Sequence, residues 1–179
     1  MTLLKTERVF TGRIVSLDID TVQYPNGTVG ELEMLRHPGA SAVVPFLDDP
    51  QSDDPRVILI HQFRHATGDY LWEIPAGRRD GIETPEATAI RELREETGYA
   101  CDNLHKLTWI WTTPGFTDEV IHLFMATGLT PGETARESDE ILDLHLLRWS
   151  EVRAMIRAGK IVDAKTLTAL LYAEVEVRR

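Results

Sequence analysis

The sequence of 179 residues lacks several features that mark particular classes of protein. It has a single cysteine, Cys101, so it can form neither an intrachain disulfide nor a cysteine metal cluster, and we expect a small buried or half-buried residue there. No signal-peptide-like apolar stretch opens the chain, and no segment reaches the roughly 18 apolar residues of a membrane span. These absences predict a cytoplasmic protein without a membrane partner.

Positive charge is also scarce. The chain has 19 Lys and Arg residues against 29 Asp and Glu residues, a formal net charge of -10. Because nonspecific binding to nucleic acid depends on many cationic contacts to phosphates, this balance predicts no nucleic-acid partner. Composition is otherwise that of a globular protein with one core, at 42% hydrophobic and 27% charged residues. If the substrate is an anion, the negatively charged protein would need to bind a cation in order to hold it.

Strands are expected to dominate the first half of the chain. Residues 8–24 and 28–36 are rich in Val and Ile and flank Pro25-Asn26-Gly27, which predicts a β-hairpin with Gly27 in the turn. The polar segment 48–55 predicts a surface loop between two buried strands. The further predicted strands are 41–47, 56–63, 104–113, 119–127 and 141–147.

Three helices are predicted among and after these strands. In the first, Thr84 suits the N-cap, Pro85 suits the first helical position and Gly98 suits the end. The other two are expected at about 150–158 and 163–177. This order of elements predicts an α/β or α+β fold in which helices pack on a mixed sheet as a sandwich.

The first predicted helix places three carboxylates on one face. Glu92 and Glu96 are four residues apart, and Glu95 is three residues from Glu92. Like charges at this spacing destabilise an isolated helix by about 0.2–0.5 kcal/mol per pair, so they call for a cation. Oxygen ligands favour a hard divalent ion such as Mg²⁺. Taken alone, the same run would be a solvated helix face in which Arg91 pairs with Glu95.

The segment from Gly77 to Tyr99, GRRDGIETPEATAIRELREETGY, resembles the Nudix box. That pattern runs Gly, five residues, Glu, seven residues, Arg-Glu, an aliphatic residue, any residue, Glu-Glu, any residue, Gly and an aliphatic residue. The matching positions are Gly77, Glu83, Arg91, Glu92, Leu93, Glu95, Glu96 and Gly98. Only Tyr99 departs, being aromatic, and we expect it to pack without loss of chemistry.

The resemblance implies a Nudix-type α/β/α sandwich at residues 41–179, with a β extension at 1–40. It implies that Mg²⁺, or Mn²⁺ or another divalent cation in its place, is bound by the box glutamates and a main-chain carbonyl. The implied metal ligands are Ala76, Glu92, Glu95 and Glu96. Glu95 and Arg91 are expected to be catalytic, Arg91 by holding the glutamates in ion pairs. Glu83 is expected to be mainly structural or to lie in the outer shell of the metal site. Water would attack one phosphorus of a diphosphate, because divalent cations lower the pKa of that water.

Flanking residues resemble the ADP-ribose pyrophosphatase branch of the family. Glu73-Ile74-Pro75-Ala76 runs directly into the box, and Pro114 stands fifteen residues after Tyr99, in a Thr-Pro-Gly context where the branch typically has Ser-Pro-Gly. The resemblance covers nearly the whole chain. It implies hydrolysis of ADP-ribose to AMP and ribose 5-phosphate. The alternatives are another nucleoside diphosphate sugar, such as GDP-mannose, or a non-catalytic module that senses ADP-ribose.

The same branch suggests roles for residues outside the box. Arg64 matches an arginine that contacts the diphosphate, although it also suits a surface strand end; Glu73 is assigned to the substrate site with it. Gly115 would let its backbone approach the terminal ribose, or only make a turn. In the late loop 132–142, Glu140 is the first choice for activating water and Glu137 the second, with solvated acids as the alternative.

The branch also implies a homodimer. In it, the N-terminal strands would reach across to the partner and help to shape its adenine pocket.

Overall fold

The computed structural model describes residues 1–134 and 141–177. The chain divides into two compact units, one of residues 1–39 and 111–120 and the other of residues 40–110 and 121–179. No helix among the described residues is long and apolar enough to cross a membrane.

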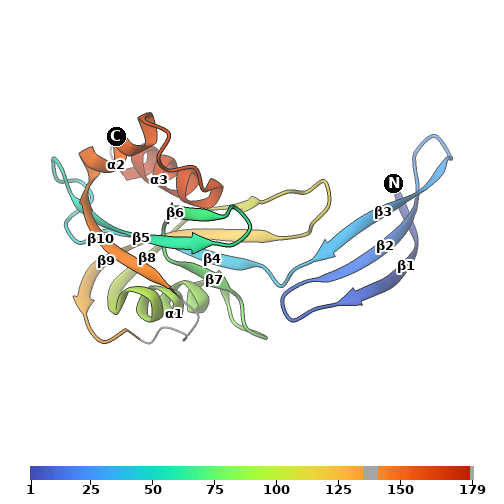
Figure 1. The fold of residues 1–179 in the computed structure, drawn as a ribbon, viewed down its shortest axis with the longest axis horizontal. Coiled ribbons are helices and arrows are strands. Elements are labelled where there is room, and N and C mark those ends of the chain that lie inside the picture. Colours follow the sequence, from blue (N-terminus) through green and yellow to red (C-terminus); the bar gives the residue numbers. More distant parts are fainter. Residues whose placement is uncertain (135–140, 178–179) are drawn as a thin grey trace. The chain divides into compact units, whose positions relative to one another are not determined.

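The first unit contains an antiparallel sheet in the order β1-β2-β3 (Figure 1). Its strands are β1 (Thr2–Thr11), β2 (Ser16–Gln23) and β3 (Val29–Arg36). The predicted turn joins β2 to β3: Gly27 has a φ of 85°, and the Thr28 amide donates to Asn26 Oδ1 at 3.1 Å. Residues 8–24, predicted as one run, bend back at a second turn, where the Gly12 amide donates to the Val15 oxygen at 2.9 Å.

Charged side chains tie residues 111–120 to this sheet. Arg36 on β3 pairs with the buried Asp18 at 3.0 Å and with Asp118 at 3.5 Å. The His37 amide donates to Asp118 Oδ1 at 2.8 Å. Hydrogen bonds from Arg8, and then from Arg36, lower the pKa of Asp18. The buried aspartate is therefore charged and matched by cations from its own unit.

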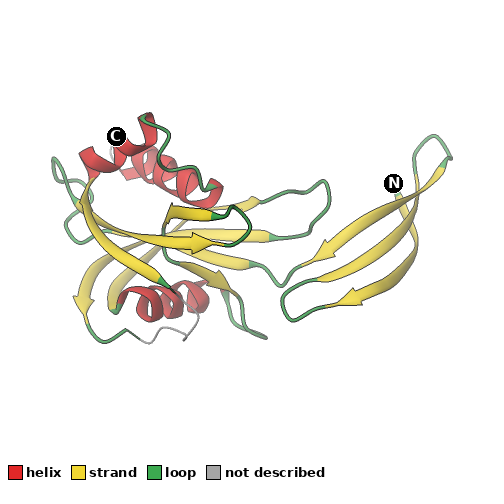
Figure 2. Cartoon of the chain, viewed as in Figure 1, coloured by secondary structure: helices red, strands yellow, loops and turns green. Residues whose placement is uncertain are grey.

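The second unit combines two sheets with three helices (Figures 1 and 2). The four-stranded sheet has the order β7 (Ala76–Arg78), β4 (Ala40–Pro45), β9 (Val120–Pro131) and β8 (Tyr99–Trp111), with β4 parallel to β9. The three-stranded antiparallel sheet has the order β10 (Leu142–Arg148), β5 (Arg56–Arg64) and β6 (Asp69–Glu73). The helices are α1 (Pro85–Thr97), α2 (Trp149–Arg157) and α3 (Ala164–Val177).

Strand β4 divides the core of this unit, because all six of its residues are buried. Val43 packs in a cluster with Leu93 of α1, whereas Val44 packs in a larger cluster with Leu59 of β5 and Leu170 of α3. Helices therefore lie on both sides of the strands, as Figure 2 shows. The predicted mixed α+β sandwich is confirmed.

Candidate active site

Helix α1 is fixed at both ends by the residues that predicted it. The Thr84 hydroxyl accepts from the Ala87 amide at 3.2 Å, and Pro85 occupies the first turn. At the other end Gly98 has a φ of 79°, and its amide donates to the Arg94 oxygen at 2.8 Å. Both ends of α1 are capped, which fixes where the helix begins and ends. The caps therefore also fix the direction in which each glutamate leaves the helix.

Arg91 is the hub of the box, since its guanidinium contacts three glutamates. Nε and Nη2 donate to the two carboxylate oxygens of Glu83 at 2.9 and 3.0 Å. Nη1 donates to Glu92 Oε1 at 2.7 Å and to Glu95 Oε2 at 2.9 Å. These contacts, with the bond to Glu83 as the largest cause, raise the pKa of Arg91. The guanidinium is thus a permanent charge among carboxylates.

Glu83 links this hub to the loop that precedes α1. Besides Arg91, its Oε2 accepts from the buried Thr88 hydroxyl at 3.0 Å and from the Asp80 amide at 3.2 Å. Its main-chain oxygen accepts from Arg79 Nη2 at 2.6 Å. The Arg91 hydrogen bond, followed by those of Asp80 and Thr88, lowers the pKa of Glu83 to about 2. The sequence did not single out Arg79 or Thr88, because neither fits a catalytic pattern.

The first residues of the box lie directly against two buried glutamates of α1. Glu92 is 6% exposed and Glu96 is 2% exposed. The Ala76 amide donates to Glu96 Oε2 at 3.0 Å. A Cβ atom on Gly77 would lie 1.9 Å from Glu92 Oε1, so no side chain fits there while the carboxylate keeps its position. Glycine at this position therefore lets the main chain reach the carboxylates.

The carboxylates of α1 have the donor chemistry of a site for a hard divalent cation. Glu92 and Glu95 meet a single guanidinium, which leaves negative charge in excess around Arg91. Among residues 1–134 and 141–177, no three acidic, His or Cys side chains are grouped to hold an ion. Glu92 and Glu95 point to Arg91, whereas Glu96 accepts from Ala76. The chemistry of these carboxylates suits such a cation, but their described positions do not gather them around one point, and the assignment of these ligands stays a prediction.

Arg64 and Glu73 form a second charged cluster at the ends of β5 and β6. Nε and Nη2 of Arg64 donate to Glu73 Oε1 and Oε2, each at 2.7 Å, while Glu73 is 1% exposed. Burial alone would raise the pKa of Glu73, but Arg64 and Lys165 outweigh it and lower this pKa. The hydrogen bond to Glu73 is the largest cause of the raised pKa of Arg64. The chain connects this cluster to the box, because Ala76, three residues after Glu73, donates its amide to Glu96 Oε2 at 3.0 Å. Glu73 is thus a buried partner of Arg64.

Lys165 is a charged member of this cluster that the sequence did not indicate. Its Nζ donates to Glu73 Oε2, and to Asp163 Oδ2 at 3.0 Å. A lysine in the first turn of a helix carries no pattern that would connect it to an acid on a distant strand.

Three other predicted residues are not joined to the box by described contacts. Gly115 belongs to the first unit, in a turn where the amides of Phe116 and Thr117 both donate to the Thr113 oxygen at 3.1 Å. Glu137 and Glu140 lie outside the described residues. The roles given to these three residues therefore stay predictions.

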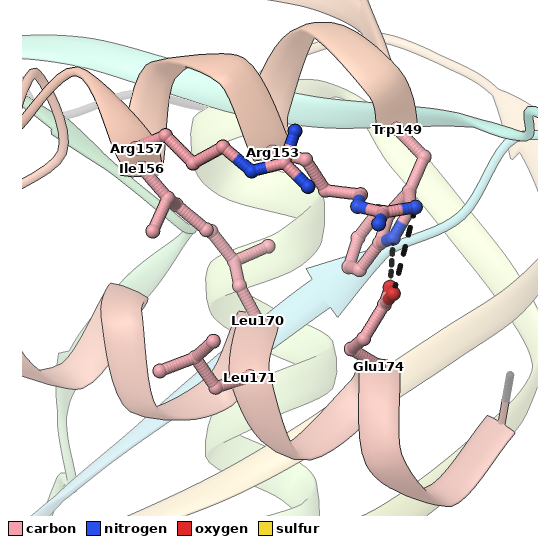
Figure 3. Close-up of a pocket in the computed structure, with 7 residues that line it drawn as sticks. All are labelled: Trp149, Arg153, Ile156, Arg157, Leu170, Leu171 and Glu174. Carbon is pink, nitrogen blue, oxygen red and sulfur yellow. Dashed lines mark hydrogen bonds and ion pairs between the residues drawn. The ribbon is translucent and has the colours of Figure 1, made fainter. Parts of the chain in front are cut away.

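A pocket of about 210 Å³ between α2 and α3 is separate from the box. Its walls are largely apolar, with Ile156 and Leu170 among them, and Glu174 accepts from Trp149 Nε1 at its edge (Figure 3). None of the residues that line this pocket belongs to either charged cluster. The candidate active site is therefore the region of the box and Arg64.

Comparisons with known proteins support this assignment. A family model of the NUDIX domain matches residues 36–170. A methanol dehydrogenase activator from Bacillus methanolicus is 39% identical over 175 residues, which cover 97% of this chain and 92% of that protein. An ADP-ribose pyrophosphatase from Bacillus subtilis (strain 168) is 36% identical over 172 residues, which cover 95% and 90%.

A solved structure has the same fold. The crystal structure of an ADP compounds hydrolase matches with a TM-score of 0.83 at 22% identity, and the match covers 97% of this chain and 92% of that one. The similarity extends over both described units.

Proposed function

The chain belongs to the Nudix hydrolase family, and from this premise we propose that it hydrolyses the diphosphate of ADP-ribose to AMP and ribose 5-phosphate with a divalent cation. The observation that carries the proposal is the proximity of two opposite charged clusters. The box gathers carboxylates around Arg91; Arg64 pairs with Glu73, which lies three residues before Ala76, and the Ala76 amide donates to Glu96 Oε2 at 3.0 Å. Carboxylates suit a cation and a guanidinium suits phosphate oxygens, so together they suit a metal-bound diphosphate.

The side chains of the chain itself would bind and orient the substrate. Arg64 would contact the diphosphate, because a planar guanidinium matches pairs of phosphate oxygens. Arg91 would keep Glu92 and Glu95 in fixed rotamers, while Glu96 is held by the Ala76 amide. Fixed ligands reduce the reorganisation needed when charge builds up on the phosphate.

The cation has two chemical tasks in this scheme. Bound by Glu92, Glu95, Glu96 and the Ala76 carbonyl, it would neutralise phosphate charge and favour the deprotonation of water. In this proposal the cation is Mg²⁺, with Mn²⁺ as a substitute. A glutamate of the loop 132–142, Glu140 or Glu137, would accept the proton.

A substrate panel tests the proposal. Purified protein should release AMP from ADP-ribose when Mg²⁺ is present and should release none in excess EDTA. GDP-mannose should be hydrolysed more slowly, with a lower kcat/KM. Faster turnover of GDP-mannose would replace the substrate, and tight ADP-ribose binding without AMP release at saturating Mg²⁺ would indicate a sensing module.

The proposal includes a homodimer built through the N-terminal strands, with the extension at residues 1–40 and the hydrolase domain at 41–179. Strand β1 supports it, because β1 is an edge strand, all ten of its residues are exposed, and Leu3, Val9 and Phe10 are among them. Edge strands that expose apolar side chains favour pairing with another chain. Light scattering after size exclusion should give twice the chain mass. A fully active monomer would contradict the shared adenine pocket.

A further inference from the structure

Two cations donate to the carboxylate of Glu73, although Arg64 alone would pair with it. Glu73 is buried, and Arg64 already occupies both of its carboxylate oxygens. Lys165 donates to the same carboxylate and is 12% exposed. Bringing a second cation with so little exposure to a paired carboxylate costs desolvation, so a neutral side chain would suit a purely structural role better.

Helix α3 holds Lys165 in this place through its first turn. Asp163 caps the helix: its Oδ2 accepts from the Thr166 amide at 3.0 Å and from Lys165 Nζ at 3.0 Å. The fully buried Thr166 hydroxyl accepts from the Ile74 amide at 3.0 Å. Ile74 follows Glu73 and precedes the residues that contact Glu96. The same turn therefore fixes both the lysine and the segment that enters the box.

One edge of the Arg64 guanidinium is not used in the contact with Glu73. The bond to Glu73 uses Nε and Nη2, on one side of the fork, and Arg64 donates no other side-chain hydrogen bond within the described part of the chain. An arginine has five N–H groups, so the Nη1–Nη2 edge can still bind an oxyanion in a bidentate manner. Arg64 is 40% exposed, which leaves this edge within reach of a ligand.

From these contacts we propose that Lys165 is a positioning residue for the diphosphate site. Lys165 balances the negative charge of Glu73. Glu73 can therefore orient Arg64 while the positive charge of Arg64 still attracts a diphosphate. With Lys165 neutral, Arg64 would be the only cation on a buried carboxylate and would attract a diphosphate less strongly. This inference rests on the proposed function, because it assigns Lys165 a role in binding the substrate of that reaction.

Steady-state kinetics on ADP-ribose with Mg²⁺ test the inference. In Lys165→Met, KM should rise about tenfold because Arg64 attracts the diphosphate less strongly, while kcat stays within about threefold. Lys165→Arg, which keeps the charge, should recover most of the affinity. Because Lys165 acts through Arg64, the double variant Arg64→Met/Lys165→Met should have the same kcat/KM as Arg64→Met.

Lys160→Met is the matched control, since Lys160 is an exposed lysine before α3 and should leave KM unchanged. All assays are run well below the melting temperature of each variant. A purely structural Lys165 would lower kcat with the folded fraction and leave KM unchanged, and this result would overturn the inference. Additive losses in the double variant would do so too. If the wild-type protein hydrolyses no nucleoside diphosphate, the proposed function fails, and the inference fails with it.

Discussion

The two charged clusters of the second unit are built in opposite ways. Around Arg91 one cation meets three carboxylates, those of Glu83, Glu92 and Glu95. Around Glu73 one carboxylate meets two cations, those of Arg64 and Lys165. The first cluster keeps an excess of negative charge, and the second keeps a guanidinium edge for a further anion.

This difference shows how the proposed function would reconcile an acidic protein with an acidic substrate. A chain of net charge -10 repels a diphosphate at long range, but the local charge of each cluster differs from the average of the chain. In the proposed function, the carboxylates would bind a divalent cation and the paired arginine would bind phosphate oxygens. Variants that change one cluster and leave the other intact separate the contributions of the two clusters to catalysis, binding and stability.

The largest effect is expected from Glu96→Gln, on the helix that carries Glu92 and Glu95 of the first cluster. The amide can still accept from the Ala76 N–H, but the negative charge is lost from a buried ligand position. We expect kcat on ADP-ribose to fall on the order of 1,000-fold, with little change in melting temperature. Glu86→Gln, an exposed glutamate in the first turn of the same helix, should be nearly neutral. Robust turnover by Glu96→Gln would remove Glu96 from the metal site.

Gly77→Ala should have the next largest effect, because it displaces a carboxylate without removing any charge. The new Cβ would lie 1.9 Å from Glu92 Oε1, which also accepts from Arg91 Nη1 at 2.7 Å. A ligand moved by about 1 Å can cost roughly 100-fold in kcat. Binding of ADP-ribose in EDTA should change little, since Arg64 is untouched. If kcat is preserved, the position of Glu92 is not critical.

The sequence predicted the first cluster far better than the second. Helix periodicity is local, so the spacing of Glu92, Glu95 and Glu96 was sufficient to place them on one face. The contact between Lys165 and Glu73 spans 92 residues and depends on how α3 packs against β6, which no local pattern specifies.

The sequence did not predict strands β6 and β7, for a similar reason. Strands β6 and β7 have five and three residues, too few for a clear alternation in the sequence. Their residues include Glu73 and Ala76, which connect the two clusters. The parts of the site that depend on tertiary pairing were therefore the parts that the sequence left open.

Arg91→Met should affect stability more than it affects the second cluster. Removing the guanidinium takes the Arg91 ion pair from the buried Glu92, and we expect a loss of about 2–3 kcal/mol. For a chain of this length, that corresponds to a melting temperature lower by roughly 5–10 °C. Because a cation can replace the lost charge, Mg²⁺ should raise the melting temperature more in the variant than in the wild type. Equal shifts would show that a bound cation does not replace the charge of Arg91, and no shift in either protein would show that the carboxylates bind no cation.

The smallest effect concerns Glu83 and pH. Hydrogen bonds, above all from Arg91, lower the pKa of Glu83 from 4.5 to about 2 in the folded protein. A carboxylate whose pKa is lower in the folded state stabilises the fold above its unfolded pKa, and this stabilisation is lost as the pH falls from about 4.5 to about 2. The melting temperature should therefore fall less steeply between pH 5 and pH 3 in Glu83→Gln than in the wild type. Glu86→Gln should keep the wild-type slope, and identical slopes in all three proteins would mean that the pairing of Glu83 with Arg91 does not contribute to stability.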